Sequence, residues 1–209
     1  MKVKSMYVFD QKILGILMLF MSGALVLVKR TATGSVLDAP KGDGLIRLVN
    51  GFNLFFLLVV IPLTAVSLIT VWLPTGDPAR MFIFEPWLSA LLEIAGLVFF
   101  GIGFMLMGWA LTCLGKNYQI GGRAPRTEDK MVESGPYGII RHPTYAAALN
   151  ISLGLAGLIQ SWVLVGMFGL YFVLITLLIA REEDELLRAY KDQYASYQFR
   201  VKKLIPYVY

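Results

Sequence analysis

Long apolar runs separated by short polar stretches dominate the chain. The first three runs cover about residues 13–28, 52–73 and 87–114, and a fourth, 144–180, contains no charged residue. A helix needs about 20 apolar residues, within a range of about 17–25, to cross a bilayer. The first three runs therefore predict three membrane-spanning helices, the second of them kinked at Pro62.

The fourth run is too long for one crossing. As a single helix it would reach about 55 Å at about 1.5 Å per residue, whereas the hydrocarbon core is about 30 Å thick. The polar pair Gln160–Ser161, followed by Trp162, is the natural turn of a hairpin with spans at about 144–159 and 162–180. The pattern thus predicts an all-α, polytopic integral membrane protein with five transmembrane helices.

The distribution of basic residues favours five crossings and sets the orientation. With five, one side of the membrane receives only four of the 19 Lys and Arg residues, namely Lys2, Lys4, Lys12 and Arg80. The positive-inside rule then places the N-terminus outside and the C-terminus in the cytoplasm. If 144–180 were a single span, the basic tail would change sides and the bias would vanish.

Composition agrees with a membrane protein. The 209 residues are 57% hydrophobic and 16% charged, whereas soluble domains are about 25% charged. Lys29 and Arg30 follow the first run in place of a signal-peptidase site, so we expect a retained span. With neither an internal repeat nor a long linker, residues 1–209 are predicted to form one membrane domain. Segments 115–143 and 181–209 are its cytoplasmic elements.

Few residues offer metal or membrane-buried chemistry. The single cysteine, Cys113, excludes an intrachain disulfide and a cysteine metal cage, and its expected role is packing. With one histidine as well, no metal site is predicted. Within the spans, Glu93 is expected to snorkel to the outer surface, and Asn53 and Asn150 to form hydrogen bonds between helices.

The tail continues the last span with a helical pattern. Apolar and aromatic residues recur at spacings of three and four: Leu186, Leu187, Tyr190, Tyr194, Tyr197 and Val201. One interpretation is an amphipathic helix lying on the membrane surface. The other is a helix that folds back over 115–143 and closes a pocket, which the three tyrosines favour because they can both stack on a ligand and form hydrogen bonds to it. The acidic cluster 182–185 is either a solvated face or a grip for a cationic or hydroxyl-bearing ligand.

The stretch GPYGIIRHPTY, residues 135–145, gathers polar chemistry at a span boundary. It holds His142, the only histidine, beside Arg141 and directly before Pro143, a residue suited to the first turn of a helix. A lone histidine is commonly structural. A helix N-terminus flanked by Arg and His is also a ready anion site for a carboxylate or a phosphate.

An ordered set of these motifs is similar to that of the isoprenylcysteine carboxyl methyltransferase family of integral membrane enzymes. The set runs ESGPYGIIRHPTY, an apolar hairpin, REEDELL, YKDQYASY and LIP, and covers roughly residues 115–209. The resemblance implies a methyltransferase that uses S-adenosylmethionine (SAM) on the cytoplasmic side. Its cofactor-binding residues would be Gln119, Met131, Val132, Tyr137, His142, Pro143, Tyr145, Glu182, Tyr190 and Tyr194. The candidate catalytic residues are Arg141, Glu183 and Arg181.

The chain departs from that family at two places. Leu178 falls at about the position of an arginine that contacts the acceptor's carboxylate in eukaryotic members, and Arg181 is the nearest arginine. Asp129 stands where those members have a histidine. The methyl acceptor, predicted to be lipophilic, is therefore left open among a prenylated cysteine, another lipid carboxylate, a thiol and an amine, and the oligomeric state is left open too.

Two other functions remain open from the sequence. LIPYVY at the C-terminus resembles the ending of NADPH-dependent, sterol-type membrane reductases, although the tail lacks their Gly and Trp and Thr144 replaces their asparagine. A non-enzymatic transporter or scaffold is the second alternative. Neither a P-loop nor a dinucleotide-binding glycine motif is present.

Overall fold

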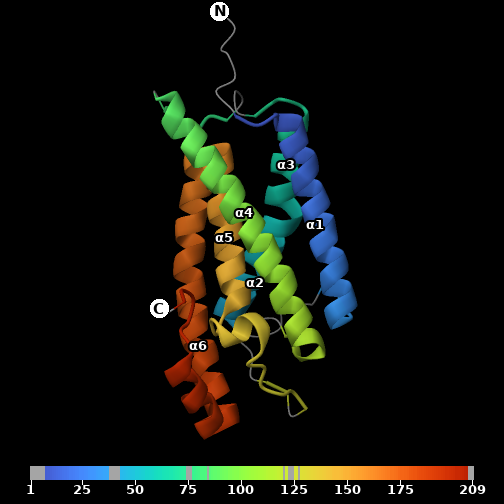
Figure 1. The fold of residues 1–209 in the computed structure, drawn as a ribbon, viewed down its shortest axis with the longest axis vertical. Helices are drawn as coiled ribbons and strands as arrows, with labels where there is room; N and C mark the ends of the chain where they lie inside the picture. The colour runs from blue at the N-terminus through green and yellow to red at the C-terminus, as the bar shows by residue number, and fades with distance from the viewer. Residues whose placement is uncertain are drawn as a thin grey trace, which may run out of the picture.

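The computed structural model describes residues 8–37, 43–73, 77–83, 85–119, 121, 125–126 and 128–206. Its helices form an elongated bundle (Figure 1). They are α1 (Gln11–Thr33), α2 (Gly44–Phe55), α3 (Ile61–Ile69), α4 (Pro86–Leu114), α5 (Pro143–Ile159) and α6 (Trp162–Arg200). The predicted all-α fold is confirmed. Lys2, Lys4 and the last three residues of the tail lie outside the described residues.

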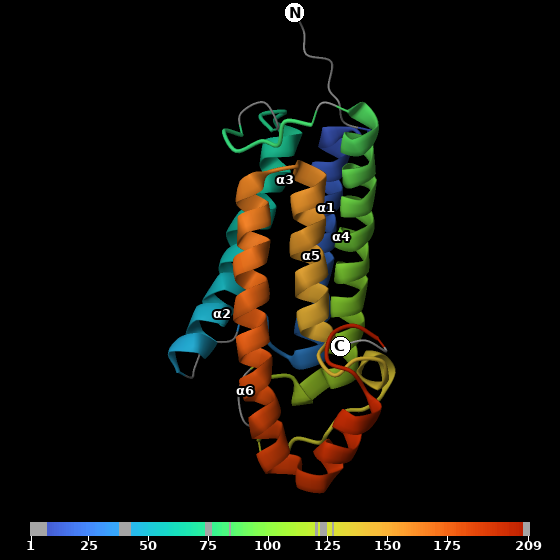
Figure 2. The ribbon, with the colours of Figure 1, turned by 90° about the vertical axis from the view of Figure 1, so that its left-hand side faces the viewer.

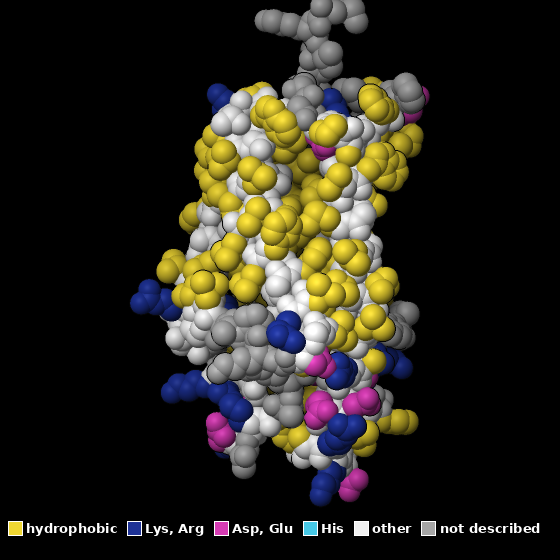
Figure 3. Space-filling model, turned by 180° about the vertical axis from the view of Figure 1, so that it is seen from behind, with side chains coloured by type: hydrophobic (Ala, Val, Ile, Leu, Met, Phe, Trp, Pro, Cys, Tyr) yellow, Lys and Arg dark blue, Asp and Glu magenta, His cyan; other side chains and the backbone are white. Residues whose placement is uncertain are grey.

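Four helical segments are long and apolar enough to cross a membrane: Gln11–Thr33, Gly44–Ile69, Pro86–Asn117 and Trp162–Tyr190. Apolar side chains cover the middle of the bundle in Figure 3, and charged ones gather at its lower end. The chain is therefore a multi-pass integral membrane protein. The remaining predicted span corresponds to α5, which has 17 residues, most of them buried among the other helices. The count of five crossings stays a prediction.

The second span begins earlier than its apolar run. The run predicted 52–73, but the helix starts at Gly44, where the Asp43 side chain caps it by accepting a hydrogen bond from the Ile46 N–H at 3.1 Å. A π-helical turn, Phe56–Val60, joins α2 to α3 directly before Pro62. Proline lacks an N–H, and the wider turn accommodates the lost hydrogen bond at the predicted kink.

The predicted hairpin turn is confirmed. α5 ends at Ile159, Gln160 takes a left-handed conformation with φ 55°, and α6 begins at Trp162. The buried Gln160 side chain exchanges two hydrogen bonds with Ser89 of α4, at 3.0 and 2.9 Å. These bonds fix the turn against α4 at what we call the hairpin end of the bundle.

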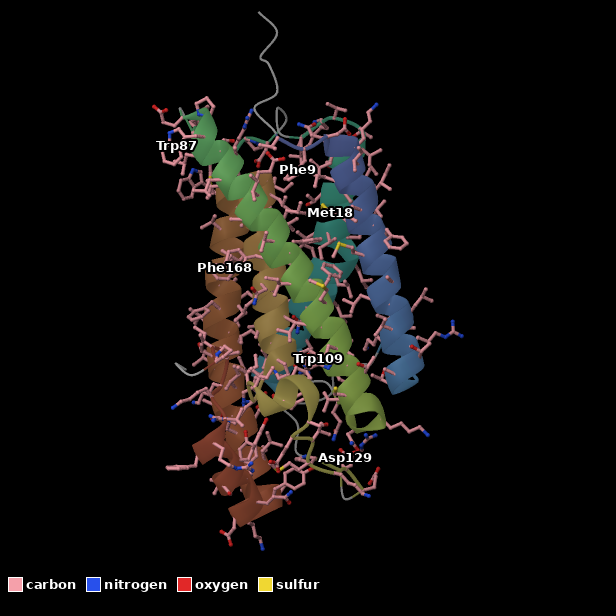
Figure 4. The ribbon with its side chains drawn as sticks, viewed as in Figure 1. Phe9, Met18, Trp87, Trp109, Asp129 and Phe168 are labelled. Carbon is pink, nitrogen blue, oxygen red and sulfur yellow. The ribbon has the colours of Figure 1, made fainter. Side chains whose placement is uncertain are left out.

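A buried carboxylate also holds the hairpin end together. Glu93 of α4 is fully buried and accepts hydrogen bonds from the backbone N–H groups of Val8 and Phe9, at 2.7 and 3.0 Å. Figure 4 shows Phe9 at this end, with Trp87 at the upper end of α4. The expectation that Glu93 snorkels is wrong, because the chain before α1 satisfies its carboxylate inside the protein.

The opposite end, which we call the loop end, carries segment 115–143 and the tail (Figure 2). Asn53 accepts a hydrogen bond from the Tyr171 hydroxyl and so links α2 to α6, as expected for an interhelical asparagine. Asn150 instead donates to the Ala146 carbonyl of its own helix, at 2.7 Å. The prediction of an interhelical role holds for the first asparagine and is wrong for the second.

Glycines allow α4 and α5 to pack backbone to backbone. A Cβ atom built on Gly103 would lie 2.7 Å from the Ile151 nitrogen and 2.8 Å from the Ala147 carbonyl oxygen. A Cβ on Gly154 would overlap the Phe100 nitrogen, and one on Gly96 would lie 2.8 Å from the Gly154 carbonyl oxygen. Small residues at such crossings let helices in lipid gain close van der Waals contact. This contact sets the separation of the two central helices.

Gly154→Ala should therefore lower the free energy of unfolding by about 1–3 kcal/mol, the usual cost of overpacking. Gly101 of α4 is the matched control, because a Cβ there meets nothing within 4 Å. Gly101→Ala should be neutral or stabilising by up to about 1 kcal/mol, since alanine is the better helix former. Denaturant unfolding in detergent, followed by circular dichroism, measures both. Equal effects of the two substitutions would contradict the backbone packing.

Candidate functional site

The R-H-P motif is held in place by backbone pairing with the end of the tail. The Arg141 N–H donates to the Lys202 carbonyl at 2.7 Å, and the His142 N–H donates to the Lys203 carbonyl at 3.0 Å. Upstream, Gly135 begins a short 3₁₀ turn with φ +60°, and a Cβ there would lie 2.6 Å from the Cys113 sulfur. Glycine therefore lets this turn lie against α4, and the chain leads directly into α5 at Pro143.

Glu183 binds both side chains of the Arg-His pair. Its Oε1 accepts hydrogen bonds from Arg141 Nε and Nη2, at 2.9 and 2.7 Å, and lies 3.2 Å from His142 Nε2. Lys203 Nζ lies 3.1 Å from the other carboxylate oxygen. Arg141 also donates to the backbone carbonyls of Gln198 and Val201. The ion pairs of Arg141, Glu183 and Lys203 thus join the segment before α5 to α6 and to the tail.

α6 bends at its lower end and turns back beneath segment 115–143 (Figure 2). Lys191 has a φ of 48° at this bend, a conformation that residues other than glycine seldom adopt. Beyond it, Tyr194, Tyr197 and Val201 form a small core with Met131. The Tyr197 hydroxyl donates to the Tyr137 carbonyl at 2.6 Å. These contacts support the fold-back interpretation over a helix lying on the membrane surface. Leu187 is an exception, because it is exposed.

Asp129 organises the loop that faces the tail (Figure 4). Its carboxylate accepts hydrogen bonds from the Gln119 side chain and from the Arg126 backbone N–H and guanidinium. Burial alone would raise the pKa of this carboxyl, but the bonds from Arg126 and Gln119 bring the pKa below its ordinary value. The Tyr190 hydroxyl donates to the Asp129 carbonyl at 3.3 Å. The loop and tail therefore form two facing walls.

A cavity of about 330 Å³ begins between these walls and continues up between the helices. Its lower part, the polar limb, is lined by Gln119, Asp129, Met131, Val132, Tyr137, Arg141, His142, Tyr145, Glu182, Tyr190 and Tyr194. Its upper part, the apolar limb, is lined by Leu25, Val26, Leu54, Phe56, Leu57, Ile61, Met107, Leu111 and Ile151. One space thus joins a polar pocket at the loop end to an apolar pocket inside the bundle.

Most of the residues predicted for the site line the polar limb, but three do not. Pro143 is buried at the start of α5. Glu183 lies behind the Arg-His pair, and Arg181 forms an ion pair with Asp43 at the start of α2. Their contacts hold helices in place at the loop end. Their predicted roles in binding and catalysis stay predictions.

Two tyrosine hydroxyls on the polar limb lack a partner among the described residues. The side-chain oxygens of Tyr137 and Tyr194 are buried and form no hydrogen bond with any described residue. Burial raises the pKa of both hydroxyls, so each stays protonated and able to donate. Leaving a buried polar group unsatisfied costs about 1–3 kcal/mol. A bound ligand or water would remove that cost.

The first two spans contribute to the cavity wall, although no sequence motif assigns them a role. The apolar limb takes Leu25 and Val26 from α1, and Leu54 from α2. Asn50 and Asn53 of α2 also lie on the cavity wall. Two asparagines three residues apart at the start of an apolar run were the one signal that could have indicated this wall.

Comparison with known proteins identifies the family that this site resembles. Residues 91–193, from α4 through the first turns of the tail, match the model of the phospholipid methyltransferase family. The solved structure of a eukaryotic intramembrane Ras methyltransferase, isoprenylcysteine carboxyl methyltransferase, is similar in fold. Its TM-score is 0.53 at 20% identity, covering 90% of this chain and 74% of that one. The predicted resemblance to the isoprenylcysteine carboxyl methyltransferase-like membrane family is confirmed.

Two curated relatives carry other descriptions. The cobalt-zinc-cadmium resistance protein CzcN of Cupriavidus metallidurans is 31% identical over 120 residues, which is 57% of this chain and 51% of that protein. The nickel-cobalt-cadmium resistance protein NccN of Alcaligenes xylosoxydans xylosoxydans is 25% identical over 122 residues, 58% and 53% of the two chains. The chain therefore matches about half the length of these relatives. No cluster of three or more metal-binding side chains occurs among the residues that the structure describes.

Glu183→Gln should loosen the tail from the R-H-P motif at residues 141–143. The substitution keeps the side-chain shape but leaves the buried Arg141 guanidinium without its carboxylate. Breaking a buried ion pair in this way costs about 3–5 kcal/mol. Hydrogen exchange of residues 194–204, followed by mass spectrometry, should show faster exchange.

Glu185→Gln is the matched control for this experiment. Glu185 is the carboxylate of an exposed ion pair with Arg188 at 2.8 Å, on the same helix. Exposed pairs contribute about 0–1 kcal/mol, so exchange of the tail should stay close to that of the wild type. Equal exchange in the two variants would refute the anchoring role of Glu183.

Proposed function

We propose that the protein is a SAM-dependent methyltransferase that acts on a lipophilic acceptor, a carboxylate, thiol or amine, at the cytoplasmic face of the membrane. The observation that carries the proposal is the single cavity that joins a polar, tyrosine-lined limb to an apolar limb among the helices. A water-soluble cofactor and a membrane-soluble acceptor require such a pair of connected sites. The family match over α4, α5 and α6 supports methyl transfer as the chemistry.

The residues of the polar limb fit the chemical groups of SAM. The two unpartnered hydroxyls of Tyr137 and Tyr194 can donate to its carboxylate or ribose oxygens. The Glu182 carboxylate, which accepts a hydrogen bond from Tyr145, can receive the ammonium or the ribose hydroxyls. Met131 and Val132 offer an apolar surface for the adenine. Gln119, His142 and Tyr190 complete the proposed cofactor wall.

When bound, SAM supplies an electrophilic methyl group on a sulfonium centre. The protein's own task is then to hold the acceptor in line with that group. Well-oriented intramolecular reactions reach effective molarities of about 10⁵–10⁸ M, so positioning supplies a large part of the acceleration. A thiolate or carboxylate acceptor needs little proton transfer. Among the predicted catalytic residues, we assign Arg141 and Glu183 to positioning, because they bind each other and the tail.

Arg181 belongs to the same positioning group in this proposal. Its ion pair with Asp43 ties α6 to the start of α2. The same helix, α2, supplies part of the apolar limb. The contact would hold the acceptor wall at a fixed distance from Glu182, the next residue along α6. Arg181 therefore acts on the acceptor site through α2.

Ligand binding tests the proposed function directly. Calorimetry on the purified protein in nanodiscs should detect binding of SAM or S-adenosylhomocysteine, and either ligand should raise the melting temperature while NADPH should not. A rise with NADPH alone would favour the reductase. If neither ligand binds, the methyltransferase proposal is refuted and a transporter or scaffold is favoured.

Tyr194→Phe should separate cofactor binding from stability. Its hydroxyl has no hydrogen-bond partner in the part of the chain that the structure describes, so its loss should leave the unliganded protein as stable or slightly more so. The same loss should weaken S-adenosylhomocysteine binding about three- to tenfold, the effect of one neutral hydrogen bond.

Tyr197→Phe is the contrasting variant. It removes a hydroxyl that donates to the Tyr137 carbonyl, so it should lower stability by about 0.5–1.5 kcal/mol. Melting curves without ligand and calorimetry with ligand measure both effects. Unchanged affinity in Tyr194→Phe would refute the assignment of that hydroxyl to the cofactor.

The proposed orientation follows from the same site. A cofactor that comes from the cytoplasm requires the loop end on that side, which agrees with the basic residues of the loops and tail. An alkaline phosphatase fused to the C-terminus should be inactive, and a green fluorescent protein fused there should fluoresce. Phosphatase activity together with a dark fluorescent fusion would reverse the orientation.

A further inference from the structure

Two asparagines lie on the cavity wall beside the apolar limb, together with Tyr171. Asn50 and Asn53 belong to α2 and are three residues apart, so their side chains share one face of the helix. Leu54 and Leu57 continue the wall above them. Polar side chains inside membrane spans are costly and mark binding sites or hydrogen bonds between helices. Of the hydrogen bonds that these two amides form, one joins two helices, namely the bond between Asn53 and Tyr171 of α6.

Each amide retains one unused group. Asn50 Nδ2 donates to the Ile46 carbonyl of its own helix at 2.8 Å, and Asn53 Oδ1 accepts from Tyr171. A side-chain amide has both an acceptor oxygen and an NH₂ donor. Asn50 Oδ1 and Asn53 Nδ2 form no hydrogen bond within the described part of the chain. The wall therefore offers one acceptor and one donor at adjacent positions.

These groups lie well above the proposed cofactor. Tyr171, the partner of Asn53, precedes Glu182 by eleven residues along α6. At about 1.5 Å per residue, the two positions are about 16 Å apart along the helix. Tyr171 also packs in the same buried cluster as Tyr145 of the polar limb, so the asparagine wall begins where the polar limb ends. An acceptor whose reacting group lies beside the cofactor would therefore pass the asparagines with its body.

The charge of the wall restricts what this part of the acceptor can be. The charged side chains that line the described cavity, Lys29, Asp129, Lys130, Arg141 and Glu182, all belong to its loop end. Leu178, at about the position of the family's acceptor-binding arginine, is fully buried in the helical core and is not on the cavity wall. A charged group beside α2 would be desolvated without a counter-ion. An uncharged group with hydrogen-bonding capacity suits the two amides.

We propose that Asn50 and Asn53 bind an uncharged hydrogen-bonding group within the apolar body of the methyl acceptor. A secondary amide matches both of them, because its N–H faces Asn50 Oδ1 while its carbonyl faces Asn53 Nδ2. The acceptor is then a long apolar molecule interrupted by such a group, in place of a plain hydrocarbon chain. That the ligand is the acceptor rests on the proposed function, whereas the binding preference can be measured alone.

A pair of matched thiols tests this proposal. One is an alkanethiol of about fifteen chain atoms interrupted near its middle by one secondary amide, and the other is the all-methylene thiol of equal length. Native mass spectrometry of the purified, cofactor-free protein compares their binding. The wild type should prefer the amide-containing thiol at least about threefold, as expected for one or two neutral hydrogen bonds. Equal binding would overturn the proposal.

Variants locate the preference. Asn50→Leu leaves the bond between Asn53 and Tyr171 in place, so it should keep the fold and lose a large part of the preference, and Asn50→Leu with Asn53→Leu should lose the rest. Asn150→Leu is the matched control, because the side chain of Asn150 donates to the Ala146 carbonyl within α5 and is not among the residues that line the cavity. If Asn50→Leu retains the full preference, the assignment is wrong.

Cofactor binding separates this outcome from that of the proposed function. In calorimetry, both α2 variants should bind S-adenosylhomocysteine like the wild type. Binding of that ligand without any amide preference refutes only the acceptor inference. An amide preference without any cofactor binding refutes only the methyltransferase.

Discussion

Glu183 holds together the three segments on which the polar limb depends. Its carboxylate comes from α6, its Arg141 and His142 partners precede α5, and Lys203 comes from the end of the tail. The Arg141 guanidinium extends the connection to the carbonyls of the returning tail. Isolated at the end of a span, a carboxylate would only be solvated. Surrounded by three basic side chains, it fixes the angle at which the tail crosses the loop.

The consequence of this connection is a pocket with unequal walls. The R-H-P side is rigid, because backbone hydrogen bonds and the ion pair both hold it. The tail side is a thin layer in which Tyr190, Tyr194 and Tyr197 pack on Met131, apart from the main core. Elements with few buried contacts open most readily. The tyrosine layer therefore rests on fewer buried contacts than the R-H-P side, and the bonds of Glu183 and Arg141 tie it to that side.

The sequence predicted the elements of this arrangement better than their connections. Apolar periodicity identified α4 and the hairpin at Gln160, and the motif order indicated that His142, Tyr145 and Glu182 share a site. The bend at Lys191 could not be predicted, because lysine carries no signal for a positive φ. The internal use of Glu183 was hidden for a related reason. Two adjacent glutamates look alike in sequence, and only the turn of α6 decides which faces the cavity.

The first two spans illustrate a second limit. Their apolar residues serve equally well against lipid, against other helices or around a ligand, so periodicity alone assigns no role to Leu25 or Leu57. In the structure, α1 packs on α3 and α4 while α2 packs on α6, and the apolar limb lies among these helices. The helices are fixed at the hairpin end by Glu93 and Gln160, whose buried hydrogen bonds close that end. The hydrogen bonds at the hairpin end hold the helices together there, and the cavity, where packing contacts are lost, begins at the opposite end. The separation of the two ends explains how one small domain keeps both a close-packed core and an open site.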